Sequence, residues 1–557
     1  MEGPSRKRQR LQAALLARQQ ATAVARLRRP HPYGVRPAGN LLLLEDAERR
    51  RRLRAQAAGL GRFAVLTSFA DDSMKAEPLL EVLGYLTGAE LARAALSGRT
   101  LSAFANAPEL WRDACLRRGG DIRYAYSWRD TYAHAAGGAA KPHAPLDLRV
   151  YHNALHRAWC CGNFELRPEW LVADDVPKAD AADLSVDAFI EKYERPNMPV
   201  VLRGCLRGWA ARDRWARDAY LIEACGDAKL RATSPAAPMA VRFTAAEYLA
   251  YCKAPPQEEA PLYLFERDFL KLCPKLKDDF CVPKYFDPEA ETEGRKRPTD
   301  LFRLYGAERR PDYRWLIAGP KASGSVFHID PNSTNAWNAA VRGRKRWILY
   351  PPGCEPPPGV MPSADGADVT LPLGLGEWFL SFWAHHELRR QDPEPSRRPL
   401  EVTCEEGETI FVPAGWWHLV LNLDDVCVAI TQNYVSASNL KLVVDFLKYK
   451  EDQISGVRDR LQDGEEGDVA AAVGGTSAAV QPEQMHRELV EAMERDYPEV
   501  FQAECGEQPA AEAPCQSPNP KVTRTRTRTR STHTLGGAIK VSLRRLRTRT
   551  RTRRCGS

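Results

Sequence analysis

The sequence predicts an α+β protein in which a small helical bundle precedes an all-β barrel with flanking helices. Short apolar strands alternate with Gly/Pro turns over residues 313–434, which is the pattern of a barrel. Apolar residues recur at mainly helical spacing over residues 78–111, with breaks at glycines. A chain of 557 residues is too long for one ordinary core, so we expect two or three domains plus tails.

Basic residues are concentrated at the two ends of the chain. Residues 1–60 hold 14 Lys/Arg against 4 Asp/Glu, and residues 521–557 hold 13 against none. Since the whole chain has a formal charge of +8, residues 61–520 carry a net −15 and form an acidic middle. The Thr-Arg repeats at 523–530 and 548–553 combine dense like charge with no apolar face, which predicts a disordered tail.

The order of these patterns predicts eight segments. We expect a basic flexible arm over 1–60, a helical bundle over 71–118, a connector over 119–163, a β domain over 164–440, a C-terminal helix over 441–463, a linker over 464–482, a helix over 483–501 and a disordered Arg/Thr-rich tail over 502–557. Inside the β domain we expect a helix at 184–193, a Pro-rich insertion at 353–399 that covers one rim, and strands at 199–202, 315–317, 346–350, 409–412, 416–421 and 426–431.

Several classes of protein are excluded by composition. No apolar run approaches the length of a membrane span, so we expect no membrane association. The 14 cysteines contain no CxxC pair, which favours a reducing compartment over a disulfide framework or a zinc ribbon. The cluster Arg6-Lys7-Arg8 favours a nuclear location, with the cytoplasm as a second compartment. A solvated basic arm and an organellar transit peptide that continues through residues 11–29 stay open as alternatives.

The helical bundle resembles an F-box. The likeness rests on Glu77-Pro78-Leu79, Tyr85-Leu86, Leu91 and the closing Leu110-Trp111-Arg112. It implies that apolar helix faces dock a Skp1-type adaptor and so link the chain to a ubiquitin ligase. A short helical bundle that merely ends in a tryptophan is the structural alternative.

Two separated motifs contain the residues best suited to bind a metal. In extended chain, residues two apart point the same way, so His328 and Asp330 can face one ion. His418 stands on another predicted strand and can complete the set. Two imidazoles and one carboxylate occupy one face of an octahedron and leave three positions open, as in non-haem Fe(II) centres. Spacing alone leaves open that these are turn or core histidines. The neighbouring pair His385-His386 is predicted to be a partly exposed loop pair rather than a second metal site.

The surroundings of these residues resemble the jumonji-C (JmjC) family. The matching motifs are Tyr313-Arg314-Trp315, Gly324-Ser325-Val326-Phe327-His328-Ile329-Asp330-Pro331, Ala336-Trp337-Asn338-Ala339, Gly343-Arg344-Lys345-Arg346-Trp347, Gly415-Trp416-Trp417-His418 and Ile430-Thr431-Gln432-Asn433. The likeness covers residues 164–439 and is strongest to the branch of bifunctional arginine demethylases and lysyl hydroxylases. It implies a double-stranded β-helix (cupin or jelly-roll) fold, with His328, Asp330 and His418 as the catalytic Fe(II) ligands. It also implies 2-oxoglutarate and oxygen as cosubstrates, with succinate and carbon dioxide as products.

The resemblance also assigns the contacts to 2-oxoglutarate. Lys345 matches the residue that pairs with the distal carboxylate, and a dianionic cosubstrate would explain an amine buried inside a barrel. Tyr263, Asn338 and Thr431 match positions that hydrogen-bond the cosubstrate. Ser325 stands where close relatives tend to have threonine. Since the hydroxyl group remains, we expect cosubstrate binding to survive.

The leading hypothesis is an Fe(II)- and 2-oxoglutarate-dependent protein hydroxylase of nuclear proteins. It would hydroxylate lysyl residues or demethylate N-methyl-arginine or N-methyl-lysine, in substrates with Lys/Arg-rich segments. The alternative is a substrate receptor of an SCF-type ubiquitin ligase whose JmjC barrel only binds. A third possibility is sequence-blind contact of the basic tails with nucleic acid, against the alternative that the repeats are simple-sequence expansion.

Overall fold

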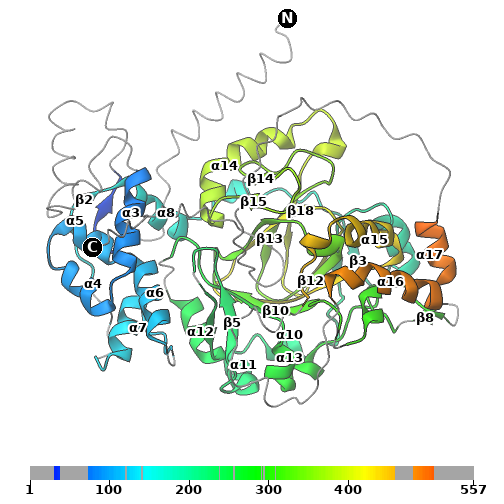
Figure 1. Cartoon of the computed structure of the whole chain (residues 1–557), viewed down its shortest axis with the longest axis horizontal. Helices are drawn as coiled ribbons and strands as arrows, with labels where there is room; N and C mark the ends of the chain where they lie inside the picture. Colours follow the sequence, from blue (N-terminus) through cyan, green and yellow to red (C-terminus); the bar gives the residue numbers. More distant parts are fainter. Residues whose placement is uncertain are drawn as a thin grey trace, which may run out of the picture.

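The computed structural model describes residues 30–37, 73–119, 122–138, 142, 144–237, 239–254, 258–289, 291–292, 295–307, 309–457 and 481–506 (Figure 1). The predicted basic arm apart from residues 30–37, nearly all of the predicted linker, and the tail beyond residue 506 lie outside the described residues. No helix in the described part of the chain is long and apolar enough to cross a lipid bilayer.

Five short helices form the N-terminal bundle. They are α3 (Ser73–Gly84), α4 (Gly88–Ala94), α5 (Arg99–Ala105), α6 (Pro108–Arg118) and α7 (Trp128–Ala135). Helix α4 begins with a capping box, in which Thr87 and Glu90 bond each other's main-chain N–H groups. Leu79, Leu91 and Phe104 are completely buried, so the helical spacing of apolar residues corresponds to a packed core.

Part of the predicted arm is built into this bundle. The two-residue strand β1 (Val35–Arg36) pairs in parallel with β2 (Val150–Tyr151), just before α8 (Asn153–Asn163). Val35 is buried although basic residues dominate the surrounding sequence. Residues 30–37 therefore differ from the expected flexible arm, because one valine finds a place in the core.

Eight strands form the expected double-stranded β-helix, as two facing sheets. Four belong to the centre of a nine-stranded sheet: β10 (Arg314–Gly319), β12 (Asn335–Arg342), β17 (Thr409–Val412) and β19 (Cys427–Tyr434). The other four make a second sheet in the order β11 (Gly324–His328), β18 (Trp417–Asn422), β13 (Lys345–Tyr350) and β16 (Leu400–Cys404). Consecutive strands alternate between the sheets except β13 and β16, which pair within the four-stranded sheet, and this arrangement confirms the predicted jelly-roll barrel.

Further strands extend the large sheet on both sides. They are β3 (Lys178–Asp180) and β4 (Val200–Arg203) beside β17, and β7 (Tyr263–Glu266), β5 (Leu230–Thr233) and β6 (Val241–Phe243) beside β10. Helices α9 (Val186–Phe189), α10 (Ala211–Arg214), α11 (Asp218–Cys225), α12 (Ala245–Lys253) and α13 (Phe269–Leu272) cover its outer face. The expected helix at 184–193 is present as α9 and the π-helical turn Ile190–Glu194.

The Pro-rich insertion contains an element that the sequence did not indicate. Between the short strands β14 (Met361–Pro362) and β15 (Val369–Thr370) and strand β16 lies the 16-residue helix α14 (Leu375–Arg390). Its residues Trp378, Phe379 and Trp383 pack with Phe164 and Trp170. The aromatic centre of the insertion thus covers the outer side of the four-stranded sheet.

Three helices pack together at the side of the barrel remote from the bundle (Figure 1). They are α15 (Leu440–Tyr449), α16 (Pro482–Asp496) and α17 (Pro498–Cys505). The helix expected over 441–463 is shorter because its last buried apolar residue is Leu447. The helix expected over 483–501 is divided at Pro498, which lacks the N–H needed to continue it.

A buried ion pair joins the bundle to the barrel. Arg112 of α6 is fully buried, and its Nη1 donates to Oε1 of Glu258 at 3.0 Å. Its Nη2 donates to the carbonyl oxygen of Ala236, and Tyr251 donates its hydroxyl to the other oxygen of Glu258. The guanidinium of the bundle therefore compensates a carboxylate that lies beside the large sheet.

We predict that Arg112→Ala lowers the free energy of unfolding by about 3–5 kcal/mol, because it leaves the Glu258 carboxylate buried without its cation. Thermal and urea unfolding of the purified chain measure this loss. The control is Arg487→Ala, which breaks a pair with Glu491 whose side chains are 67% and 63% exposed and should change the same quantity by less than about 1 kcal/mol. Equal stability of the two variants would contradict the prediction.

Candidate metal centre

The two histidines lie opposite each other on neighbouring strands of the smaller sheet. Strand β11 pairs with β18 so that Ser325 faces Val420 and His328 faces His418. The register shifts between Ser325 and His328, since an unbroken ladder would put Phe327 opposite His418. This irregularity, a β-bulge, sends Phe327 into the aromatic cluster beneath α14 and turns His328 towards the barrel interior.

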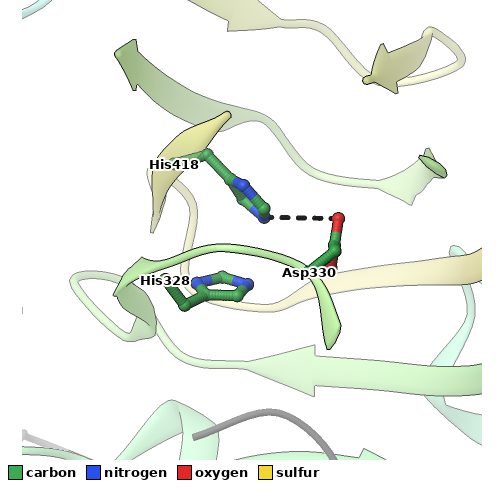
Figure 2. Close-up of side chains that lie close together, drawn as sticks. All are labelled: His328, Asp330 and His418. Carbon is green, nitrogen blue, oxygen red and sulfur yellow. Dashed lines mark ion pairs between the residues drawn. The ribbon is translucent and has the colours of Figure 1, made fainter. Parts of the chain in front are cut away.

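Asp330 completes the set from the loop that follows β11. It keeps an extended backbone, with φ −60° and ψ 140°, so its side chain lies on the same side as that of His328. Figure 2 shows the two imidazoles and the carboxylate converging on one point. One ligand atom from each of the three residues lies within 4.8 Å of the other two. The structure thus brings together the three residues predicted to bind iron.

Hydrogen bonds fix the same tautomer in both imidazoles. Nδ1 of His328 lies 2.8 Å from the carbonyl oxygen of Val326, and Nδ1 of His418 lies 3.1 Å from that of Trp416. A carbonyl oxygen can only accept, so each Nδ1 carries the proton. Each Nε2 is left with a free lone pair, which is the form that a metal requires.

Burial keeps the histidines neutral and leaves the carboxylate in need of a cation. Loss of solvent lowers the pKa of His328 and of His418 to about 4, and it raises the pKa of Asp330. Oδ2 of Asp330 is buried without a hydrogen-bond partner among the described residues and lies 3.9 Å from Nε2 of His418. A divalent ion bound by these three residues would supply the missing positive charge. Two neutral imidazoles, one carboxylate and three open positions fit Fe(II) better than a closed zinc site.

Lys345 lies deeper in the same barrel interior. It is fully buried at the start of β13, and its Nζ donates to the hydroxyl of Tyr263 at 3.0 Å. No carboxylate in the described part of the chain lies within salt-bridge distance of it. In the ladder, Lys345 faces Asn422 and Leu349 faces His418, so Lys345 and His418 share one face of the sheet. A buried ammonium without an anion fits the far carboxylate of 2-oxoglutarate.

The remaining predicted cosubstrate residues line the interior as well. Asn338 and Thr431 are cross-strand partners on β12 and β19, and Thr431 donates its hydroxyl to the carbonyl of Trp337 at 3.1 Å. Oδ1 of Asn338 is buried without a hydrogen-bond partner among the described residues. Ser325 is half-buried on β11 and faces Val420, whose side chain also points into the barrel. These positions are consistent with contacts to a polar cosubstrate.

The structure differs from the sequence-based interpretation of His385-His386. Both residues belong to helix α14, and His386 is completely buried. Its ring nitrogens lie 2.7 Å from the hydroxyl of Tyr350 and 3.1 Å from Oε1 of Glu401. The prediction of a partly exposed loop pair holds for the exposure of His385, which is half-buried, but the loop and the exposure of His386 were wrong because the surrounding tryptophans and phenylalanines drive helix packing.

Asn433 is a site residue to which the sequence analysis gave no role. Its side chain donates to the hydroxyl of Thr334 at 2.9 Å and interacts with the carboxylate of Asp330. The signal was present in the sequence, because Asn433 follows Thr431 by two residues in a strand and so shares its face.

Comparison with known proteins agrees with this geometry. The sequence profile of the Cupin-like domain family matches residues 186–439. The chain is 40% identical over 438 residues to the arginine-specific demethylase JMJ22 of Arabidopsis thaliana, which covers 77% of this chain and 78% of the relative.

Two further relatives match a shorter part of the chain. The bifunctional arginine demethylase and lysyl-hydroxylase psr-1 of Caenorhabditis elegans is 33% identical over 272 residues, or 48% of this chain and 64% of the relative. The 2-oxoglutarate and iron-dependent oxygenase JMJD4 of Homo sapiens is 31% identical over 300 residues, or 49% of this chain and 66% of the relative. The similarity to JMJ22 extends well beyond the barrel, since it is longer than residues 186–439.

We predict that Mn(II), used as a stable substitute for Fe(II), raises the unfolding temperature of the wild-type chain but not that of His418→Ala. A ligand at 100 times its dissociation constant stabilises the folded state by about 2.7 kcal/mol, and loss of one of three ligands removes most of this gain. Differential scanning calorimetry with and without Mn(II) measures the effect. His486→Ala, on α16, is the control and should keep the full shift. An undiminished shift in His418→Ala would contradict the assignment.

Proposed function

The chain belongs to the JmjC family of cupin-like, iron- and 2-oxoglutarate-dependent oxygenases, and from this premise we propose that it oxidises lysyl or arginyl side chains of proteins. One observation carries the proposal. His328, Asp330 and His418 converge in a barrel whose interior also holds the uncompensated ammonium of Lys345. A barrel that only bound a peptide would have no use for either feature.

Each group of this chain has a defined task in the reaction. His328, Asp330 and His418 would hold Fe(II), which supplies the oxidation that couples decarboxylation of 2-oxoglutarate with transfer of one oxygen atom to the target. Lys345 and Tyr263 would bind and orient the cosubstrate through its far carboxylate. The ring centroid of Trp347 lies 5.9 Å from that of His418, with 28° between the two ring planes, so Trp347 would limit the rotation of the imidazole.

Two observations support basic side chains as the target. JMJ22 and psr-1 are named for acting on arginine, or on arginine and lysine. Residues 61–520 carry a net −15, which attracts Lys/Arg-rich segments over a distance. Hydroxylation of a lysyl carbon gives hydroxylysine. Hydroxylation of an N-methyl carbon gives a hemiaminal that releases formaldehyde, so both outcomes follow from one oxidation.

We predict that the purified chain with Fe(II), 2-oxoglutarate and oxygen adds one oxygen atom to Lys/Arg-rich peptides or removes a methyl group from their methylated forms, as detected by mass spectrometry. Lys345→Met should raise the KM for 2-oxoglutarate by about 10- to 150-fold, the value of a charge-assisted hydrogen bond of about 1.5–3 kcal/mol. The exposed Lys271→Met serves as a control and should behave like the wild type. Folded, iron-loaded protein that forms neither succinate nor a modified peptide would remove the proposal.

We further propose that the bundle docks a Skp1-type adaptor while the barrel remains catalytic. Val82, Tyr85 and Leu96 are 45%, 79% and 87% exposed on the bundle, and apolar side chains at such exposure are suited to a partner surface. The intact metal triad and the similarity to named oxygenases favour an active enzyme over a receptor with a binding-only barrel.

The adaptor proposal predicts that the purified chain retains a Skp1-type adaptor in a pull-down and that Tyr85→Ala with Leu96→Ala weakens this retention at least tenfold. Large apolar side chains that act as hot spots of an interface cost about 2 kcal/mol or more each when they are truncated. Val172→Ala, at 78% exposure outside the bundle, is the matched control. If the adaptor is retained equally by both variants, or not at all by the wild type, the bundle has another role.

Two other sequence-based expectations fall outside the described residues. The nuclear location inferred from Arg6-Lys7-Arg8 stays a prediction, as does contact of the Arg-rich tails with nucleic acid.

A further inference from the structure

Asp330 is the ligand whose position the β-sheets do not fix. His328 and His418 belong to paired strands, whereas β11 ends at His328 and Asp330 lies in the loop before β12. Oδ2 of Asp330 has no hydrogen-bond partner among the described residues, and Asn433 of β19 interacts with the carboxylate. The direction of the carboxylate therefore depends on Asn433 and on the main chain of residues 330–334.

That main chain has an unfavourable conformation. Asn332 has φ 55° and ψ 25°, and Ser333 has φ 55°, so two consecutive residues with side chains occupy the left-handed region. Asparagine tolerates this region, but a serine there persists only where the surroundings impose the conformation. We therefore expect residues 330–334 to make a contact with the rest of the chain that stabilises this backbone conformation.

The side chain of Asn332 makes that contact. Its Nδ2 donates to the carbonyl oxygen of Ser455 at 2.9 Å, and its Oδ1 accepts from the N–H of Ser455 at 3.0 Å. Asn332 is only 3% exposed, and the two bonds join residues 123 positions apart. We call this reciprocal pair the Asn332 clasp.

The segment that receives the clasp is itself anchored. The carbonyl of Gly456 accepts from the N–H of Asp312, which lies two residues before β10. The carboxylate of Asp312 in turn accepts a hydrogen bond of 2.8 Å from Nη1 of Arg267. A second asparagine supports the loop from the same side, because Nδ2 of Asn439 donates to the carbonyl of Ser333 at 2.9 Å. The loop after Asp330 is thus tied to the chain that follows α15, beyond the residues matched by the family profile.

We propose that Asn332 is a positioning residue for the metal, which holds the loop that presents Asp330 and so sets the affinity of the site for divalent ions. Groups that orient a ligand without touching the ion commonly change metal affinity by 10- to 100-fold. The inference rests on the proposed metal role of His328, Asp330 and His418. It adds that residues 455 and 456, outside the barrel, contribute to that role.

The test compares Mn(II) affinity, measured by the electron paramagnetic resonance signal of free Mn(II), in the full-length wild type and two glycine variants. Asn332→Gly removes both bonds of the clasp while permitting the left-handed backbone, and it should weaken Mn(II) binding about 10- to 100-fold. Ser333→Gly adds the same backbone freedom at the next residue, keeps the clasp, and should bind like the wild type. Activity of Asn332→Gly should recover when Fe(II) is raised, with kcat close to that of the wild type.

Wild-type affinity in Asn332→Gly, or an equal loss in Ser333→Gly, would overturn the clasp as the cause. If Asn332→Gly lacks a native near-ultraviolet circular dichroism spectrum, the variant Asn332→Asp provides the test instead. Its carboxylate still accepts a hydrogen bond from the N–H of Ser455, but it cannot donate to the carbonyl oxygen of Ser455. That variant should also bind Mn(II) more weakly, and unchanged binding would count against the clasp. Absence of Mn(II) binding in the wild type would instead remove the proposed function itself.

Discussion

The pairing of β11 with β18 is the constraint on which the rest of the site depends. Side chains alternate along a strand, so a slip of one residue exchanges the inner and outer faces. The β-bulge between Ser325 and His328 makes this exchange once, at the end of β11. It places Phe327 among the aromatic residues below α14 and His328 opposite His418. A β-bulge of one residue therefore allows the same strand to pack an aromatic side chain outside the barrel and to present a metal ligand inside it.

The barrel interior combines this geometry with polar groups that the protein does not satisfy by itself. Lys345 is buried without a carboxylate within salt-bridge distance, and Oδ2 of Asp330 and Oδ1 of Asn338 have no hydrogen-bond partner, among the described residues. Buried groups of this kind destabilise a fold unless something compensates them. The carboxylate of Asp330 is complementary to a divalent cation, and the ammonium of Lys345 is complementary to a dianion deeper in the barrel. The site is thus preorganised for its ligands at the expense of the stability of the ligand-free barrel.

Local pattern in the sequence predicted the barrel and five of its eight strands, whereas the assignment of the three metal ligands needed the resemblance to the JmjC family as well. The short apolar runs of β13, β17 and β18 between Gly/Pro turns, and the spacing of His328 from Asp330, are visible without any tertiary information. Helix α14 was missed because its apolar residues lie on nearly every side and leave no clear periodicity, while prolines flank it on both sides. Buried partners such as Glu258 for Arg112, or Ser455 for Asn332, were beyond reach, since they join residues more than a hundred positions apart.

These long-range contacts join the barrel to the bundle and to the chain after α15. The family profile ends at residue 439, yet the loop carrying Asp330 is bonded to Ser455, and Glu258 beside the large sheet is compensated by Arg112 from the bundle. The similarity to JMJ22 likewise spans 438 residues, far more than the barrel alone. Arg112 of the bundle compensates the buried carboxylate of Glu258, and the main chain of Ser455 satisfies the buried side chain of Asn332 in the barrel loop. Because two buried polar groups of the barrel depend on partners outside it, the bundle and the chain after α15 belong to the same folding unit as the metal centre.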